Sequence, residues 1–539
     1  MGIMTPNATQ APVKIAGSSI FGRHHMISDE RTWNMFLSDN WLINFAGYNV
    51  GVEILPFGTE AEGRGLFHST RGNFLIVVIN NRIYKIFPNM GWQFLFQLDT
   101  SSGEVFMDEN LSSQICIVDG SSNADGSPRA YIYNYSQGID AVQIVNFTGT
   151  AQQFQPNYVV YHNTYFIFGN ALTTASGSRW YIYKTGFTPP STNPFDLAFA
   201  QVLTIQTKPD FAKAVVRIPS HGNYILVMGS VVSELWANVA GAQFYQRNSS
   251  INIDYGVASV STIAFSDDMV AWLGINEKAS PAIMVMAGDK AIRLSTDGID
   301  FLLSTIKHPD KSTAMFYRQD GHVFYILTFF HQDDNLSITY DFTTQKFFDL
   351  TDWDFTYHPA RQMAFFNNET FFVSLKQGSL MRMSTAITSM STNAQNDYEI
   401  PRVRKCDTFR LPGSDRFIVN QFAFTIENGV EPNVDLQVEC DGYILGEVSS
   451  QIMYSEDDLP LLVEAGSCSV YRPRIDVTIS KNGGETYSNA VSYYMHATGH
   501  YKNQPRFHKL GEANQFTIQM RFWGFGAVVI VDGVLEVYQ

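Results

Sequence analysis

Paired runs of Val, Ile, Phe and Tyr recur along most of this chain, with turn residues between the two runs of each pair. Runs of this kind are typical of β-hairpins. Successive hairpins begin about 40 to 60 residues apart, which suits the four-stranded blades of a β-propeller. We predict seven hairpins, at Phe74–Ile79 with Ile83–Phe87, Ile115–Val118 with Ala130–Tyr135, Tyr165–Gly169 with Trp180–Tyr183, Tyr224–Trp236, Met269–Leu294, His322–Leu350 and Thr370–Met383.

The large number of aromatic strands favours a closed ring of blades over an open stack. Closure leaves only short, protected sheet edges, whereas open rows of such strands would invite aggregation. The blade that closes a ring often takes strands from both ends of the chain, so these hairpins are compatible with about six to eight blades. We therefore predict an all-β chain with a propeller in residues 65–385.

The segment before the propeller, residues 1–64, has a mixed pattern. Ser28 is suited to cap a short helix, because two acidic residues follow it. The apolar residues of this helix would be Trp33, Phe36 and Leu37. We therefore expect an N-terminal arm with a short helix, followed by the first strands.

The region after the propeller divides into a linker and a second domain. Residues 386–399 are rich in Ser, Thr and Asn and predict a polar linker. Alternating strands resume in residues 400–539 and predict a C-terminal β-sandwich or small barrel. Its strands are expected at Phe417–Ile426, Val434–Cys440, Ile475–Ile479, Phe516–Trp523 and Val528–Val537.

The chain is acidic, with 36 Lys and Arg residues against 51 Asp and Glu residues and a formal net charge of -15. Such a surface repels phosphate, which argues against a DNA-binding enzyme. The densest basic group consists of Arg402, Arg404 and Lys405. Because acidic residues flank this group, we expect a solvated linker or a subunit contact there.

Cysteine usage and the chain's apolar runs give no sign of a metal, a disulfide framework or a membrane. The cysteines are Cys116, Cys406, Cys440 and Cys468. They are widely separated and form no CxxC pair, so we expect buried free thiols. No secretory signal, myristoylation signal or run of about 18 apolar residues is found, so we expect assembly in the cytoplasm without a membrane span.

Three pairs of adjacent carboxylates are the first candidates for acid and base catalysis, namely Asp267-Asp268, Asp333-Asp334 and Asp457-Asp458. Two carboxyl groups can divide into an acid and a base only when they face each other. Neighbouring residues of a turn point apart, so we interpret all three pairs as solvated turns.

The segment Ser480–Tyr487 is similar to the Asp-box turn of sialidase-type propellers, with Asn482 in place of the Asp. Ser295–Gly298 is a looser version of the same pattern. Such boxes cap hairpins through a side-chain hydrogen bond and have no catalytic content. A sialidase also needs an arginine triad and a Tyr/Glu nucleophile pair, which no pattern in this sequence identifies.

The remaining candidates for a site are weak. His24 and His25 could begin a metal site with Asp29 or Glu30, but neighbouring residues rarely reach one ion, so a mobile loop is preferred. We expect a turn at Gly63–Gly65 that is too short to cradle phosphate, and no nucleophile elbow, phosphate-binding loop or zincin motif is present. We therefore predict a protein that is not an enzyme, with no catalytic, cofactor-binding or metal-binding residues and no cofactor.

A series of short segments follows one order and spacing along the chain. These segments are Trp33–Met35, Gly47-Tyr48, Gly63–Gly65, Ile83–Ile86, Gly229-Ser230, Ser233–Trp236, Gly256–Ser259, Ala271–Gly274, Ser280–Ala282, Gly288–Ile292, Ser295-Thr296, Asp320–His322, Tyr340-Asp341, Lys346–Leu350 and Gly378–Leu380. Together they resemble the tail-hub or packaged-DNA-stabilisation proteins of short-tailed bacteriophages of enteric bacteria. Apparent insertions around 123–128, 172–178 and 189–194 keep a distant phage lineage or a related tail-nozzle protein as alternatives.

The resemblance implies a structural virion protein of the viral tail, without catalytic residues. It implies a homo-hexameric ring, the tail hub or nozzle at the head-tail connector, beneath the portal and adaptor proteins. Such a ring would close the head, retain packaged DNA and form the conduit for DNA ejection without specific DNA binding. A tail needle, fibre or spike would dock on it. An acidic wall suits this role, because it repels DNA and lets it slide.

Two other functions stay open. A propeller glycosidase or depolymerase of a surface polysaccharide predicts a carboxylate-lined pocket at the propeller axis. A receptor-binding fibre or tail adhesin predicts an exposed aromatic patch on one face of the propeller.

Overall fold

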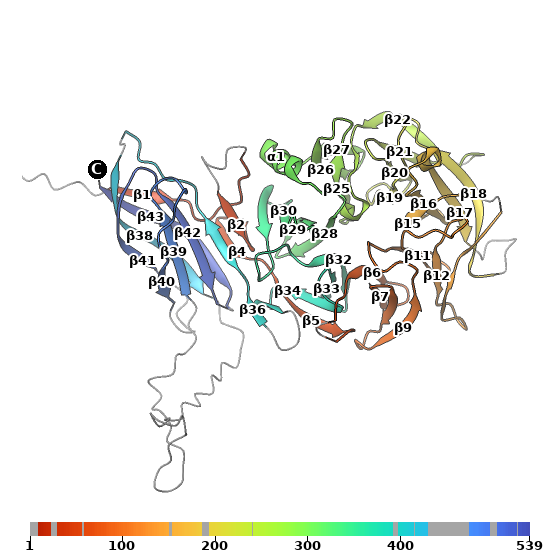
Figure 1. Cartoon of the computed structure of the whole chain (residues 1–539), viewed down its shortest axis with the longest axis horizontal. Coiled ribbons are helices and arrows are strands. Elements are labelled where there is room, and N and C mark those ends of the chain that lie inside the picture. Colours follow the sequence, from red (N-terminus) through yellow and green to blue (C-terminus); the bar gives the residue numbers. More distant parts are fainter. Residues whose placement is uncertain are drawn as a thin grey trace, which may run out of the picture. The chain divides into compact units, whose positions relative to one another are not determined.

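The regular structure of the chain in the computed structural model is almost entirely β-strand (Figure 1). The described residues are 9–22, 30–56, 59–149, 153–185, 193–239, 241–391, 397–413, 416–428, 474–495, 504–524 and 526–538. Within these ranges the one α-helix is α1 (Asp297–Thr305), and two 3-10 turns lie at Ala175–Ser178 and Val260–Thr262. No helix in the described ranges is long and apolar enough to cross a membrane. The prediction of an all-β chain is confirmed.

Two compact units make up the chain. The propeller unit comprises Ser18–Phe36 and Phe45–Pro401. The C-terminal unit comprises Met1–Gly17, Leu37–Asn44 and Arg402–Gln539. Residues from the N-terminal region therefore contribute to both units.

The described residues of the propeller unit form seven sheets, each built around a run of successive antiparallel strands (Figure 1). The first sheet contains β6 (Gly63–Ser69), β7 (Phe74–Ile79), β8 (Arg82–Ile86) and β9 (Trp92–Gln97), and the second contains β10 (Phe106–Glu109), β11 (Gln114–Val118), β12 (Tyr131–Asn134) and β13 (Ala141–Ile144). The third sheet contains β15 (Pro156–His162), β16 (Tyr165–Asn170), β17 (Arg179–Thr185) and β18 (Asp196–Thr204), with β14 (Asn146–Thr148) beside β18. The fourth sheet contains β19 (Ala214–Arg217), β20 (Tyr224–Met228), β21 (Ser233–Asn238) and β22 (Tyr245–Ile253).

The last three sheets complete the propeller. In the fifth sheet, β23 (Gly256–Val257) and β24 (Ala264–Phe265) both pair with β25 (Met269–Ile275), which is followed by β26 (Pro281–Ala287) and β27 (Lys290–Arg293). The sixth sheet contains β28 (Ser312–Gln319), β29 (His322–Phe329), β30 (Leu336–Asp341) and β31 (Lys346–Leu350), with β2 (Arg31–Trp33) beside β31. The seventh sheet contains β32 (Ala360–Phe366), β33 (Glu369–Ser374) and β34 (Ser379–Ser384), together with β5 (Gly47–Glu53). All seven predicted hairpins fall on strands of these sheets. The first strands of neighbouring sheets contact one another, from β24 through β28, β32, β6, β10 and β15 to β19.

The N-terminal strand β5 closes the ring. It pairs antiparallel with β34, and its residue Tyr48 also pairs with Met390 of β35 (Ser389–Ser391). The sheet that β5 completes therefore combines strands from both ends of the propeller unit. The predicted propeller is confirmed, and its seven sheets fall within the predicted range of about six to eight blades.

The core of the propeller lies between neighbouring sheets. Every residue of β7 is buried, because both faces of a middle strand pack against adjacent sheets. Between the third and fourth sheets, the Trp180 and Trp236 rings meet edge to face with centroids 5.4 Å apart. This burial on both faces explains why the predicted strands are continuous apolar runs.

The described strands of the C-terminal unit form two sheets. In the first sheet, β1 (Thr9–Val13) and β4 (Trp41–Asn44) pair with β43 (Val528–Tyr538), β43 pairs with β38 (Phe417–Asn428), and β38 pairs with β41 (Arg506–Ala513). In the second sheet the strand order is β37 (Arg402–Lys405), β42 (Thr517–Trp523), β39 (Arg474–Ser480) and β40 (Val491–Tyr494). Tyr493 of β40 contacts Phe507 of β41, with ring centroids 6.4 Å apart. Aromatic contacts thus join the two sheets, and the prediction of a β-sandwich or small barrel is confirmed in the form of two packed sheets. The predicted strand Val434–Cys440 lies outside the described residues.

Two local predictions were wrong. Trp33 ends strand β2, and Phe36 and Leu37 lie in β3 (Met35–Ser38), so the predicted helix does not exist there; Ser28 lies outside the described residues. Strand pairing overrides the helix signal, because Trp33 pairs with Asp349 of β31.

The predicted linker 386–399 is likewise partly structured. It contains β35 and β36 (Asp397–Glu399), which pair with each other. Met390 at the centre of β35 is buried, which anchors the segment to the propeller unit.

Candidate functional site

A small cavity lies at the propeller axis, among the first strands of the sheets. Its volume is about 270 Å³, which is below the roughly 300 to 1,000 Å³ of typical small-molecule sites. Its apolar lining includes Leu66, Phe106, Met107, Tyr158, Met315 and Met363. A cavity of this size is too small to admit a DNA duplex.

One mouth of this axis is charged. Glu104, in the loop between β9 and β10, lines both the axis cavity and a second cavity of about 560 Å³ at this mouth. The Gln362 side-chain amide donates a hydrogen bond to the Glu104 carboxylate, and the Thr313 hydroxyl lies 3.5 Å from it. Burial raises the pKa of Glu104 above its ordinary value, and the charge of Arg361 opposes part of this rise.

Arg361 at the same mouth holds two strands together. Its guanidinium lies 2.5 Å from the Glu62 carboxylate and donates to the Gly63 carbonyl oxygen at 3.0 Å. The mouth therefore contains carboxylates, as the glycosidase alternative predicts. However, Glu62 is paired with Arg361, and Glu104 is bound by Gln362.

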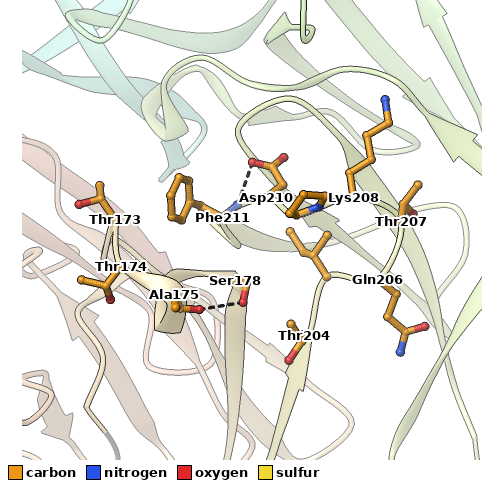
Figure 2. A pocket seen from close by; sticks show the side chains of 12 residues that line it. Thr173, Thr174, Ala175, Ser178, Thr204, Gln206, Thr207, Lys208, Asp210 and Phe211 are labelled. Atoms are coloured by element: carbon orange, nitrogen blue, oxygen red, sulfur yellow. Dashed lines mark hydrogen bonds between the residues drawn. The ribbon is translucent and has the colours of Figure 1, made fainter.

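A groove of about 550 Å³ lies between the third and fourth sheets (Figure 2). Its walls are the segments 173–178 and 204–211. The Asp210 carboxylate accepts hydrogen bonds from the backbone N–H groups of Phe211 (2.8 Å), Val231 (2.8 Å) and Val232 (3.0 Å). This acid therefore organises the turn between β20 and β21 and is not available as a catalytic base.

Glu234, in the segment Ser233–Trp236, has a similar structural role. Its buried carboxylate accepts hydrogen bonds from the Gln206 N–H at 2.8 Å, the Thr207 N–H and the Trp236 indole at 3.0 Å. The Arg247 guanidinium lies 3.7 Å away. The motif that contributed to the family resemblance thus ties β21 to the loop that precedes β19.

Three potential metal ligands come together outside these cavities. His308, His331 and Asp333 have ligand atoms that all lie within 4.8 Å of one another, and no other such group of three occurs in the described ranges. No sequence pattern joins these residues, because the two histidines lie in different loops and follow no ligand-spacing motif.

The carboxylate pairs lie in turns, as predicted, but one member is not solvated. Asp267 and Asp268 are exposed in the turn between β24 and β25. Asp334 is buried and accepts backbone hydrogen bonds, so the solvated interpretation was wrong for this residue. Asp457-Asp458 lies outside the described residues.

The turn motifs have mixed outcomes. In Ser480–Tyr487 the Asn482 side chain accepts a hydrogen bond from the Thr486 N–H at 3.1 Å, so it caps the turn as predicted. Ser295–Gly298 instead leads into α1, where Thr296 is the N-cap. The expected turn at Gly63–Gly65 is wrong, because these residues lie within strand β6.

The predicted solvated basic group is wrong for two of its members. Arg402 and Arg404 are fully buried in β37, and the Arg404 Nε donates to the Ile15 carbonyl oxygen at 2.6 Å. Cys116 and Cys406 are buried free thiols, as predicted. The candidates His24, His25, Asp29, Cys440 and Cys468 lie outside the described residues.

The part of the propeller from the end of β18 to β33 also has a recognisable sequence. Residues 201–377 match the family described as "Bacteriophage P22 Gp10, beta-propeller". This match spans about a third of the chain and contains the segments from Gly229-Ser230 to Lys346–Leu350 that resemble phage tail proteins. It supports a bacteriophage structural protein with a propeller. Comparison with curated proteins gave no match.

Solved structures that match this chain include two lyases and a WD40 domain. A streptogramin B lyase has 8% identity and a TM-score of 0.39, covering 63% of this chain and 97% of its own. A virginiamycin B lyase from Staphylococcus aureus has 10% identity and a TM-score of 0.38, with coverages of 60% and 94%. The Pan2 WD40 domain of Neurospora crassa has 8% identity and a TM-score of 0.37, with coverages of 62% and 93%.

Proposed function

We propose that this chain is the tail hub or nozzle protein of a short-tailed bacteriophage. Six copies would form a ring beneath the portal and adaptor, close the head, retain packaged DNA and conduct it during ejection. A needle, fibre or spike would dock on the distal side of this ring. The observation that carries the proposal is the match of residues 201–377 to the phage propeller family.

The axis cavity limits where DNA could pass. Apolar side chains such as Phe106 and Met315 fill the propeller axis, and only about 270 Å³ is open there. The conduit would therefore be enclosed by neighbouring copies in the ring, with each propeller forming one part of its wall. The net charge of -15 favours a wall that does not hold DNA.

A complex with the portal and adaptor tests the ring. The chain is mixed with assembled portal and adaptor, and native mass spectrometry or electron microscopy counts its copies. Six copies on one portal ring are expected. A complex that contains a single copy would contradict the proposal, whereas a monomeric isolated chain would not, because phage assembly is ordered.

The glycosidase and adhesin alternatives have their own tests. The purified chain is incubated with host surface polysaccharide, alongside Glu104→Gln and a Glu60→Gln control that alters an exposed carboxylate. Polysaccharide cleavage that only Glu104→Gln abolishes would establish an enzyme. Saturable binding of the isolated chain to host cells would favour the adhesin.

A further inference from the structure

Two loops of the propeller unit place two imidazoles and one carboxylate together. His308 lies in the loop between α1 and β28, and His331 and Asp333 lie in the loop between β29 and β30 (Figure 1 labels these elements). The two imidazole centroids are 3.7 Å apart. From the Asp333 Oδ2, the His308 Nε2 lies at 3.8 Å and the His331 Nδ1 at 4.0 Å.

Hydrogen bonds of backbone N–H groups hold these two loops together. The buried Asp334 carboxylate accepts hydrogen bonds from the N–H groups of Lys307 (2.9 Å) and His308 (2.7 Å). The Phe330 N–H also donates to the Lys311 carbonyl oxygen at 3.1 Å. His308 is thus kept beside His331 by other groups, which is the usual arrangement for a preorganised ligand set.

We infer that His308, His331 and Asp333 form a binding site for a divalent transition-metal ion such as Zn²⁺, with the fourth position open to water. Two imidazole nitrogens and a carboxylate oxygen are a ligand set that zinc accepts, at about 2.0 to 2.2 Å per ligand. Ligand atoms around such an ion lie roughly 3.3 Å apart in tetrahedral geometry. All three ligand atoms lie within 4.8 Å of one another, so these half-exposed side chains need to close by no more than about 1.5 Å to reach this spacing.

The charges around the site are compatible with a cation. Lys307 Nζ lies 3.7 Å from the Asp333 Oδ2, but 66% of this lysine side chain is exposed. Exposed ion pairs contribute little stability, so an ion can replace Lys307 at small cost. Imidazole ligands favour zinc, copper or nickel over Mg²⁺ and Ca²⁺, which prefer oxygen ligands. The site goes beyond the proposed tail function and does not depend on it.

Zinc titration of the full chain tests this inference. After removal of metals with EDTA, calorimetry is performed with Zn²⁺ and with Mg²⁺ on the wild type, His308→Ala, His331→Ala and Asp333→Asn. Matched controls are His221→Ala, an exposed histidine of another propeller loop, and Asp267→Asn, an exposed turn carboxylate.

The expected result is that each ligand variant loses one equivalent of Zn²⁺, or binds it more weakly by at least the roughly 10- to 100-fold that loss of an outer-shell partner costs. The controls should match the wild type, and Mg²⁺ should give no comparable binding. Equal Zn²⁺ stoichiometry and affinity in the wild type and in His308→Ala/His331→Ala would overturn the site.

A measurement on the unmodified chain makes the test independent of variant folding. Zn²⁺ should protect His308 and His331, but not His221, from modification by diethylpyrocarbonate, as read by peptide mass spectrometry. Equal modification of the three histidines with and without Zn²⁺ would also overturn the site.

Discussion

The Tyr48 hydroxyl donates a hydrogen bond to the Asp352 carboxylate, and this contact joins the ring-closing strand β5 to the loop before β32. Asp352 is buried, and its other oxygen lies 2.6 Å from the Lys376 Nζ. The imidazole of His358 packs edge to face on Tyr48, with centroids 5.6 Å apart. Ring closure therefore rests on polar contacts as well as on strand pairing.

The first prediction is that Tyr48→Phe destabilises the propeller. A hydrogen bond to a charged group contributes about 1.5 to 3 kcal/mol, and we expect a loss of this size in the free energy of unfolding. Urea unfolding measures it. The control is Tyr224→Phe: Tyr224 is half-buried, and its hydroxyl has no hydrogen-bond partner among the described residues, so this variant should lose less than about 0.5 kcal/mol. Equal losses of unfolding free energy in both variants would show that the hydrogen bond to Asp352 does not stabilise the propeller.

The second prediction concerns the close approach of Gly47 to the segment before β36. A Cβ atom at Gly47 would lie 2.3 Å from the Ser389 carbonyl oxygen and 2.4 Å from that of Ile387. Gly47→Ala should therefore cost at least about 1 to 3 kcal/mol, because the backbone has to move. It should also expose the 385–399 segment to limited proteolysis.

Gly222→Ala is the matched control, since a Cβ atom there meets nothing within 4 Å. If Gly47→Ala resists urea and protease as well as Gly222→Ala does, the pairing of β5 with β35 is not needed for ring closure.

How much of this fold the sequence predicts depends on where the partner residues lie. Hairpins could be predicted because their turns are local: Asn80 and Asp320 adopt left-handed φ angles of 51° and 50°, which Asn and Asp tolerate. Strand β2 could not, because Trp33 pairs with Asp349, more than half the chain away. Its local residues, read alone, favour a helix.

The candidate metal site could not be predicted from the sequence for the same reason, because its residues lie in separate loops. The metal-ligand group joins His308 to His331 and Asp333 across two loops, which the buried Asp334 carboxylate helps to hold together. The sequence shows Asp333-Asp334 as one pair, although the structure gives its two members different surroundings. A pattern of spacing cannot separate them, because the distinction is one of burial.

The third prediction is a pH dependence from His358. Burial, and secondarily the charge of Lys376, lower the pKa of this histidine from 6.5 to about 3. Because the folded state resists protonation, stability is full above pH 6.5 and is lost as the pH falls toward about 3, by up to about 1.4 kcal/mol per pH unit. His358→Gln should remove this slope. Unfolding curves of both proteins between pH 7 and pH 4 measure it, and parallel curves would contradict the prediction.

The fourth prediction is that Glu234 is required for the fourth sheet. Glu234→Ala removes the acceptor for several donors and leaves Arg247 without its nearby carboxylate, so we expect a loss of about 3 to 5 kcal/mol. Glu234→Gln keeps one acceptor oxygen and should lose less. The exposed Glu277→Gln, which removes only a pair with Lys208, should lose under about 1 kcal/mol. Thermal unfolding of the three variants should preserve this order, and an equal effect of Glu234→Ala and Glu277→Gln would contradict it.

The last prediction is that the protein has little intrinsic affinity for DNA. A protein that neutralises several phosphates presents clustered Lys and Arg residues on one face. Here the net charge is -15, and two residues of the densest basic group, Arg402 and Arg404, are buried and cannot reach phosphate. We therefore expect a dissociation constant for duplex DNA no tighter than the roughly 10⁻⁴ M at the weak end of non-specific binding at physiological salt.

Fluorescence anisotropy with a labelled duplex, repeated over a salt series, measures this affinity. Since each released counterion steepens the salt dependence, a protein without phosphate contacts should show a nearly flat response. Submicromolar binding with a steep salt dependence would show that the isolated chain grips DNA. The conduit would then have to hold DNA rather than let it slide, and the acidic wall could not be its working surface.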